Sequence, residues 1–241
     1  MARLNHGLGF LFRALADFFF PPICYGCEEE AEQGLVCDSC RLLLFTSELD
    51  VCPNCGRACV EKCSRCGENL LSRVRALGPY AEPFRGLIHA LKYREKTRLA
   101  GLLGQALATL TLQDTELRQA DVVCAVPLHP ARQRERGYNQ SELLARVVSG
   151  ETGIVFVDAL LRKRNTPTQT SQSGIAQRRR NVEDAFRIRP GVNVAGARVV
   201  LVDDVTTSGA TLNAAARHLF VAGARDVMGL VVAAASPAES S

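Results

Sequence analysis

The sequence predicts an α/β fold, a parallel β-sheet flanked by helices, preceded by a separate cysteine-rich segment. Two observations predict the sheet. From Val74 onward, apolar strand-like runs alternate with helical patterns, and one run ends in a polar loop that leads directly into a helix. The third observation is that eight of the ten cysteines lie in four C-x-x-C pairs. With 241 residues, 47% of them hydrophobic, the chain can hold one such domain and a smaller appendage.

The first twenty residues predict an amphipathic helix. Gly7–Phe20 is apolar enough to suggest a signal peptide, but Arg13 and Asp17 interrupt it and no small-residue cleavage site follows. Its uninterrupted apolar runs are too short to span a bilayer. We therefore expect a helix over residues 1–20 that packs on the rest of the protein, with membrane contact through Phe18–Phe20 as the alternative. The expected compartment is the cytoplasm, with membrane association only through partners.

The four C-x-x-C pairs predict a double zinc ribbon over residues 21–70. Two thiolates two residues apart bind one metal ion from a tight turn, and two such knuckles complete a tetrahedron. Disulfides are the alternative, but they belong to secreted proteins and no export signal is present. Pairing the knuckles in sequence order is favoured over a cross-braced arrangement that joins the first with the third. The eight predicted ligands are Cys24, Cys27, Cys37, Cys40, Cys52, Cys55, Cys63 and Cys66.

The charges between the knuckles are mixed, with an acidic start at Glu28–Glu30. This pattern favours a structural or protein-contact role for the ribbons over direct nucleic-acid contact, because the basic footprint of a nucleic-acid surface is weak. Cys59 is a spare thiol or a substitute ligand, and Cys124 is expected to be a small core residue.

Further elements follow in chain order up to a short flexible tail at residues 236–241. Leucines from Leu87 to Leu110 have helical spacing that is broken near Glu95. A stiff loop with two prolines, Pro127–Pro130, comes just after a strand, where α/β sheets bind ligands. Asn139 is expected to cap the next helix, with Glu142 three residues on. The expected strands are Val74–Tyr80, Asp121–Val126 and Asp226–Ala235.

The most informative segment is Val199–Thr211. An apolar run of β-formers predicts a strand buried on both faces, and it ends in two adjacent carboxylates, Asp203 and Asp204. A loop of small hydroxyl residues follows, then a helix that ends near Gly223. Backbone N–H groups at a helix N-terminus suit a phosphate monoester, and two carboxylates suit the two hydroxyls of a ribose. The segment therefore predicts a site for a ribose 5-phosphate group.

This segment resembles the signature of type I phosphoribosyltransferases, which bind phosphoribosyl pyrophosphate (PRPP). The resemblance implies that Asp203 and Asp204 hold the ribose 2- and 3-hydroxyls, that the loop wraps the 5-phosphate, and that Mg²⁺ bridges pyrophosphate and ribose. Thr207 stands where the purine-salvage branch carries an aspartate, which disfavours a hypoxanthine- or guanine-type acceptor. The PRPP-binding residues expected here are Asp203, Asp204, Thr206, Thr207, Ser208, Gly209, Ala210 and Thr211.

Further motifs resemble the ComF family over nearly the whole chain. They are the cysteine knuckles, Lys92-Tyr93, Arg132–Gln140 with its Arg-Gly-Tyr-Asn-Gln run, and Arg164-x-Thr166-x-x-Gln169. The resemblance implies a type I phosphoribosyltransferase fold over residues 73–235 and a link to natural competence and DNA uptake. The implied partners are PRPP, single-stranded DNA and a competence helicase or ATPase.

The resemblance also suggests roles for cations near the site. The loop with Pro127 and Leu128 is expected beside the pyrophosphate, where Arg132 and Arg136 neutralise charge; a salt-bridged helix surface is the alternative for both arginines. The segment Arg162–Gln177 is expected to be a mobile flap. Within it, Arg164 or Lys163 closes over the substrate. Asp203, Asp204 and Arg164 are the predicted catalytic residues.

Three functions remain open from the sequence. The first is a phosphoribosyltransferase with an unidentified acceptor. The second is a regulator or adaptor that binds PRPP without turnover. The third is a competence factor that contacts single-stranded DNA through its arginine clusters, although the chain lacks Trp and has few aromatic residues to stack on bases.

Overall fold

The structure is a computed structural model that describes residues 22–31, 34–46, 48–52, 70–93, 97–162 and 185–235. Several predicted features lie outside the described residues: the helix over residues 1–20, Cys55, Cys59, Cys63 and Cys66, flap residues 163–177 with Lys163 and Arg164, and the tail 236–241.

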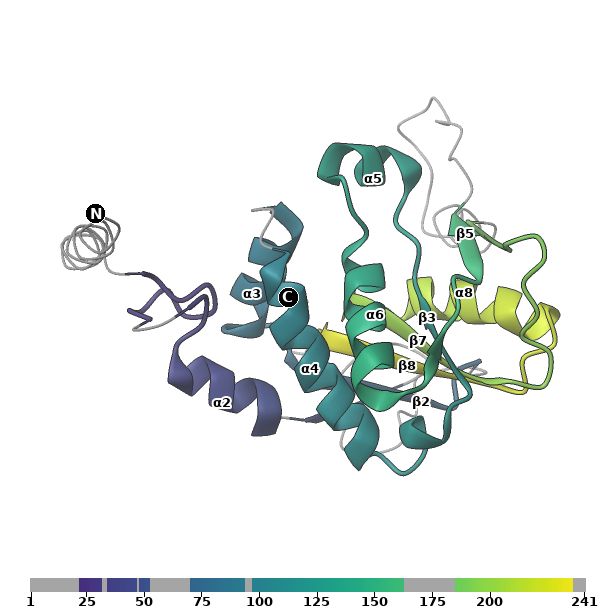
Figure 1. Ribbon diagram of the computed structural model, residues 1–241, viewed down its shortest axis with the longest axis horizontal. Coiled ribbons are helices and arrows are strands. Elements are labelled where there is room, and N and C mark those ends of the chain that lie inside the picture. Colours follow the sequence, from purple (N-terminus) through teal and green to yellow (C-terminus); the bar gives the residue numbers. More distant parts are fainter. Residues whose placement is uncertain are drawn as a thin grey trace, which may run out of the picture.

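A six-stranded sheet in the order β1-β2-β8-β7-β3-β4 forms the centre of the molecule (Figure 1). Neighbouring strands run parallel, except that β1 is antiparallel to β2. The predicted parallel sheet is confirmed, and three of the predicted strands differ from the observed ones by one residue at their ends. The strand predicted from the apolar run Val199–Val202 instead continues through Asp203 and Asp204 to Thr206, a residue that the sequence placed in the loop. The strands are β1 (Leu49–Val51), β2 (Arg73–Pro79), β3 (Val122–Ala125), β4 (Val155–Phe156), β7 (Arg198–Thr206) and β8 (Asp226–Ala234).

The strand β7 is buried on both faces, as its apolar run predicts. Val200 and Val202 belong to the core on one side of the sheet, whereas Val199 and Leu201 belong to the core on the other. This alternation follows from the two-residue period of a strand. Because both faces are covered, only the ends of the strand are open to polar chemistry.

Helices cover both faces of the sheet (Figure 1). On one side lie α3, α4 and α6, whose leucines share one core; α3 ends at Tyr93 and α4 begins at Arg98, on either side of the predicted break near Glu95. On the other side lie α8 and the two-stranded β5–β6. The bounds are α3 (Phe84–Tyr93), α4 (Arg98–Gln113), η1 (Leu117–Gln119), α5 (Pro130–Arg136), α6 (Gln140–Thr152), β5 (Leu160–Arg162), β6 (Phe186–Ile188) and α8 (Ala210–Val221).

The cysteine-rich segment shares the core of the main domain, which the sequence did not indicate. A short helix, α2 (Asp38–Thr46), packs against α4, and β1 extends the sheet. Cys24, Cys40 and Leu44 are buried in the same cluster as the leucines of α3 and α4. The first knuckle is therefore fixed against the sheet and its helices.

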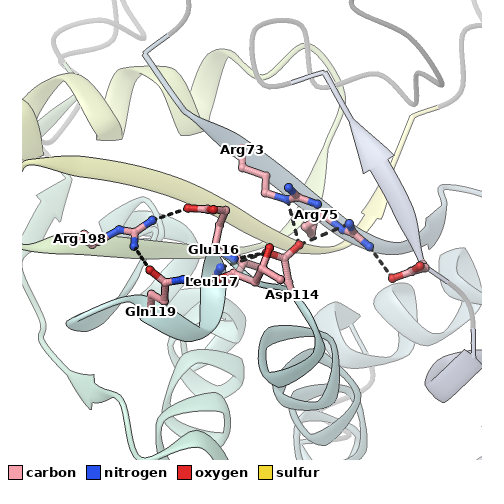
Figure 2. Close-up of polar contacts among 9 residues, drawn as sticks. Arg73, Arg75, Asp114, Glu116, Leu117, Gln119 and Arg198 are labelled. Carbon is pink, nitrogen blue, oxygen red and sulfur yellow. Dashed lines mark hydrogen bonds and ion pairs between the residues drawn. The ribbon is translucent and has the colours of Figure 1, made fainter.

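At the amino end of the strands, arginines and carboxylates form a closed network (Figure 2). The Asp114 carboxylate lies 2.9 Å from Arg73 Nε and 3.4 Å from Arg75, and it also accepts two backbone N–H groups at the start of η1. Arg198 donates to Glu116 and Gln119 at 2.6 and 2.8 Å. This end of the sheet is thus held by paired charges.

Two smaller expectations can also be compared with the structure. Cys124 is fully buried in β3, and burial raises the pKa of its thiol to about 12, so it is a core residue as predicted. Among the helices of the described residues, none is long and apolar enough to cross a membrane.

Candidate functional site

The two predicted carboxylates lie at the carboxyl end of β7 and point into a cavity of about 400 Å³. Asp203 and Asp204 are only 8% and 5% exposed. In a parallel sheet the carboxyl ends of the strands and the loops that follow them form the ligand-binding edge. The structure therefore places this acidic pair where such folds bind ligands.

Both carboxylates are oriented by the start of α6. Ser141 Oγ donates to Asp203 Oδ1 at 2.8 Å, and Gln140 Nε2 donates to Asp204 Oδ2 at 2.8 Å. Asn139 is the N-cap of α6, as expected, and its side chain also donates to the carbonyl of Val126 at the end of β3. The cap thus fixes the first turn of α6 beside the ends of β3 and β7.

A lysine from α3 completes the contacts of the acidic pair. Lys92 Nζ lies 2.8 Å from Asp204 Oδ2. The sequence left open whether Lys92 reaches the site or only extends from its helix, and the structure shows that it reaches the site. The last turn of α3 is also anchored by the Tyr138 hydroxyl, which donates to the carbonyl of Leu91.

Burial and the neighbouring carboxylate of Asp204 raise the pKa of Asp203 to about 7, while the Ser141 hydrogen bond and the charge of Lys92 act in the opposite direction. Near neutral pH, the carboxyl of Asp203 is therefore partly protonated, and a bound ligand shifts the balance between its neutral and its charged form. A perturbed carboxyl in a cavity is a feature of functional sites.

Three arginines line the same cavity as the acidic pair. Arg132 and Arg136 come from α5, and Arg162 comes from the end of β5. Arg136 donates to Gln140 at 2.5 Å and lies 5.4 Å from the centre of the Tyr93 ring. With Lys92, the cavity holds four cations against two carboxylates, an excess that suits a ligand with several negative charges.

Arg162 is partly buried and packs on an aromatic ring. Its guanidinium lies 5.3 Å from the centre of the Phe186 ring in β6. Burial lowers the pKa of Arg162, the charge of Asp203 raises it, and the charge of Arg132 lowers it further. A guanidinium placed near a second cation in this way is stabilised by any anion that binds between them.

The hydroxyl loop leads into α8, but only part of it faces the cavity. Thr207 and Thr211 line the cavity. Thr206 is buried as the last residue of β7, and its hydroxyl has no hydrogen-bond partner in the described structure. Gly209 is the N-cap of α8 with a φ of 70°, a left-handed conformation that favours glycine. Ser208, Gly209 and Ala210 form the turn without being lining residues.

Other predicted residues can be located in the same way. Pro127, Leu128, Arg132 and Arg136 line the cavity, whereas Arg164 lies outside the described residues. The sequence did not assign roles to Ser141, Gln140 or Arg162, although Gln140 stands in the Arg-Gly-Tyr-Asn-Gln run and Arg162 opens the predicted flap.

The first four cysteines form a candidate metal centre. All Sγ atoms of Cys24, Cys27, Cys37 and Cys40 lie within 4.8 Å of one another, and those of Cys27 and Cys37 are 3.6 Å apart. Tetrahedral zinc with Zn–S bonds of about 2.3 Å places its sulfurs about 3.8 Å apart. The cluster therefore fits zinc, and it unites the first two knuckles as the sequential pairing requires.

The second predicted set of zinc ligands can be followed only in part. Cys52 is buried beside β1, and its predicted partners Cys55, Cys63 and Cys66 lie outside the described residues. The second zinc site stays a prediction.

Comparison with known proteins matches residues 136–240 to the phosphoribosyl transferase domain. The DNA utilization protein YhgH of Escherichia coli O157:H7 is 33% identical over 218 residues, 86% of this chain and 94% of that protein. Competence protein F of Haemophilus influenzae is 29% identical over 215 residues, 85% and 92% of the two chains. The solved structure of the allosteric regulatory enzyme of purine biosynthesis matches at 29% identity with a TM-score of 0.39, over 55% of this chain and 25% of that chain.

Proposed function

The chain belongs to the ComF family of competence and DNA-utilization proteins, and on this premise we propose that it binds PRPP and transfers its phosphoribosyl group. One observation carries the proposal: a single cavity holds the buried pair Asp203 and Asp204, four cations and the start of α8. A diol, a monophosphate and a pyrophosphate are the three chemical groups that these features accept, and PRPP contains all three.

The acidic pair holds the sugar in this proposal. The ribose 2- and 3-hydroxyls donate to Asp203 and Asp204, whose orientation Ser141, Gln140 and Lys92 maintain. As the bond from C1 to pyrophosphate lengthens, positive charge develops on the ribose. Fixed carboxylates in a buried site stabilise that charge without reorganising.

The cations hold the phosphates. Arg132, Arg136 and Arg162 face the position of the pyrophosphate, and guanidinium groups match phosphate oxygens with paired hydrogen bonds. Thr207 and Thr211 line the cavity at the start of α8, where the 5-phosphate meets backbone N–H groups. We also retain Ser208, Gly209 and Ala210 as residues of this phosphate loop.

Two metals belong to the proposal. Zinc, held by Cys24, Cys27, Cys37 and Cys40, fixes the first knuckle on the core. Magnesium enters with PRPP, and the carboxylate oxygens of Asp203 and Asp204 are ligands of the type it takes; when bound, it neutralises charge on the leaving pyrophosphate.

The remaining sequence-based assignments stay proposals. They are the division into a helix (1–20), a double ribbon (21–70), a phosphoribosyltransferase-like domain (73–235) and a tail (236–241), the role of Arg164 and the second zinc site. A cytoplasmic location and partnership with single-stranded DNA and a competence helicase or ATPase also belong to them.

The experiment is a calorimetric titration of PRPP with Mg²⁺ into the zinc-loaded full-length protein. We expect binding that falls at least 100-fold in the double variant Asp203→Asn/Asp204→Asn, because both sugar contacts lose their charge. Glu116→Gln, at the opposite end of the sheet, is the matched control and should bind like the wild type. Equal PRPP affinity in the double variant and the wild type would refute the assignment.

A second assay separates transfer from binding alone. Pyrophosphate release from PRPP is measured with candidate acceptors present. Release that depends on an acceptor and on the acidic pair supports the transferase. PRPP binding without release for any acceptor supports the regulator that the sequence left as an alternative.

A further inference from the structure

A second cavity of about 870 Å³ lies beside the first. Three segments build it: the first cysteine knuckle, the end of β2 and the start of α3. Tyr80, directly after β2, lines both cavities, so the two are neighbours that share one side chain. The volume falls within the roughly 300–1,000 Å³ of small-molecule sites. Its lining residues are Ile23, Cys24, Tyr25, Glu28, Tyr80, Glu82, Arg85, Gly86 and His89.

The chemistry of the second cavity differs from that of the first. Its lining contains three aromatic rings, two carboxylates and one arginine, and Arg85 is 2.8 Å from Glu82 in an ion pair. No lysine is among the described residues that line it. Aromatic side chains offer stacking surfaces to flat rings, and the excess of carboxylates disfavours phosphate. The second cavity thus suits an uncharged, planar ring.

The order of the strands determines which side of the sugar faces this cavity. In the proposed function, Asp203 and Asp204 hold the ribose at the end of β7, and the pyrophosphate lies on the β3 side, beside Arg132 and Arg136. A nucleophile that displaces pyrophosphate from C1 approaches from the opposite side. In the order β2-β8-β7-β3, that side leads across β8 to β2, where Tyr80 stands.

From this geometry we infer that the second cavity is the acceptor site and that it takes a free nucleobase bearing an exocyclic amino group. The inference rests on the proposed function, because it places the acceptor relative to bound PRPP. In the transfer, a ring nitrogen of the base forms a bond to C1, the bond from C1 to the pyrophosphate oxygen breaks, and pyrophosphate leaves with that electron pair. The proton on the nitrogen passes to water.

The amino group follows from the carboxylates. Glu82 already accepts from Arg85 Nε and from the backbone N–H of Gly86, at 2.8 and 2.9 Å. Glu28 also lines the cavity and, when ionised, is an acceptor only, so it pairs with an N–H donor of a base and repels a carbonyl oxygen. Adenine carries an exocyclic amine and no carbonyl, and cytosine carries an exocyclic amine beside one carbonyl, whereas hypoxanthine and uracil carry carbonyls and no exocyclic amine. This preference agrees with Thr207 in the first cavity, which disfavours a hypoxanthine-type acceptor.

The cysteine knuckle is a rigid wall of this site. A Cβ added at Gly86, in the first turn of α3, would lie 2.5 Å from the carbonyl oxygen of Tyr25 and 2.9 Å from that of Gly26. A Cβ added at Gly26 would lie 2.8 Å from the Pro83 side chain. The knuckle and the helix therefore touch backbone to backbone, and zinc at the knuckle keeps one side of the acceptor cavity in place.

The test is base binding by calorimetry to the zinc-loaded full-length protein. Adenine, cytosine, hypoxanthine and uracil are titrated in the presence of saturating ribose 5-phosphate, which has no pyrophosphate to displace, so no reaction occurs. We expect adenine and cytosine to bind at least tenfold more tightly than hypoxanthine and uracil. An eight-residue single strand of deoxyadenosine, titrated in the same way, should bind more weakly than adenine.

Two variants locate the binding. Tyr25→Leu, at an aromatic residue that lines the second cavity and not the first, should lose at least tenfold in adenine affinity while its PRPP affinity stays within threefold of the wild type, which also shows that the variant is folded. Glu28→Gln should reduce the preference for adenine over hypoxanthine, and Glu29→Gln, a neighbour that does not line the cavity, is its matched control.

Three results would overturn the inference while PRPP still binds: no base binds, Tyr25→Leu binds adenine as the wild type does, or the single strand binds more tightly than the free base. Failure of the wild type to bind PRPP would overturn the proposed function, and the inference with it. The PRPP titration therefore distinguishes the two failures.

Discussion

Both ends of the sheet carry arginines and carboxylates, but the two kinds of side chain pair with each other at the amino end and much less at the carboxyl end. At the amino end, Arg75 is 7% exposed and lies between the carboxylates of Asp114 and Glu48, at 3.4 and 2.5 Å (Figure 2). At the carboxyl end, neither Arg132 nor Arg162 forms an ion pair with a carboxylate among the described residues, although two buried carboxylates lie in the same cavity. One end is neutralised within the protein, and the other is left with an excess of positive charge.

This difference assigns the two ends different roles, the amino end in stability and the carboxyl end in ligand binding. A buried charge without a partner costs free energy, so a closed network such as that of Asp114 stabilises the fold. In the cavity, Arg132 and Arg162 have no carboxylate partner among the described residues and the two carboxylates sit side by side, so the cavity gives up stability that a bound ligand restores. Changes at the amino end should therefore affect unfolding, and changes at the carboxyl end should affect binding.

The largest expected effect comes from breaking the amino-end network. Asp114→Ala removes the carboxylate that Arg73 and Arg75 share and the acceptor of two backbone N–H groups. Removing one partner of a buried pair typically costs about 3–5 kcal/mol, and we expect a loss of that size in the free energy of unfolding, measured by urea denaturation. The PRPP affinity of the folded variant should not change; a loss in binding as large as the loss in stability would contradict the comparison.

The next effect compares one arginine from each end. Arg162→Gln removes a cation of the cavity and should weaken PRPP binding by about 1.5–3 kcal/mol, roughly 10- to 150-fold, since hydrogen bonds to charged groups are of that size. Its thermal midpoint should stay near that of the wild type. Calorimetry and thermal denaturation measure the two quantities on the same samples.

Arg198→Gln is the matched change at the other end. Arg198 pairs with Glu116 and Gln119, and its side chain is 13% exposed. This variant should lower the thermal midpoint and keep PRPP affinity. If both arginine variants lose stability and affinity in the same proportion, the two ends are not functionally distinct.

The parts of the candidate site that could be predicted from the sequence are those encoded in short, contiguous stretches of chain. The strand, acidic pair, hydroxyl loop and helix of residues 199–220 are contiguous, so their period and composition are enough to place Asp203 and Asp204 at a strand end. The first zinc cluster was predictable for the same reason, because two short C-x-x-C turns lie only ten residues apart. Contiguous motifs can be located without knowing the fold.

The contacts that the sequence missed join distant elements. Ser141 and Gln140 are 62 and 64 positions from the carboxylates they contact, and nothing in their local pattern indicates which strand end they meet. Likewise, the three-residue β1 lies between cysteine knuckles, and only its pairing with β2 shows that it belongs to the sheet. Such contacts depend on the order of the strands in the sheet. The alternation of strands and helices along the sequence does not determine that order.

The pH dependence of stability offers a separate test of the carboxyl end of the sheet. The pKa of Asp203 is about 7 in the folded protein, against an ordinary value of 3.8. Between about pH 4 and 7, the unfolded chain has lost this proton while the folded chain holds it, so stability falls as pH rises, by up to about 1.4 kcal/mol per pH unit. Above about pH 7 this dependence ends.

Urea denaturation of the wild type and Asp203→Asn from pH 5 to 8 measures that difference. The variant should be the less pH-dependent of the two, and it should gain stability relative to the wild type as the pH rises to about 7. Parallel pH profiles would show that Asp203 ionises in the folded state as easily as in the unfolded chain.

The smallest expected effects come from substitutions of two adjacent threonines, which lie where the buried core meets the PRPP cavity. Thr206 is 3% exposed and its hydroxyl has no hydrogen-bond partner in the described structure, whereas Thr207 lines the cavity. Thr206→Val replaces an unsatisfied buried hydroxyl with a methyl group of similar size, so it should raise the free energy of unfolding by up to about 1 kcal/mol and leave PRPP affinity unchanged.

Thr207→Val should do the reverse, with unchanged stability and PRPP affinity reduced several-fold, because Thr207 lines the cavity near the start of α8 and the change removes a hydrogen-bonding hydroxyl. The pair is measured by urea denaturation and calorimetry. A Thr206→Val variant that loses PRPP affinity would move the phosphate loop one residue toward the strand. The boundary between the part of β7 that stabilises the fold and the part that binds ligand would then lie before Thr206 rather than after it.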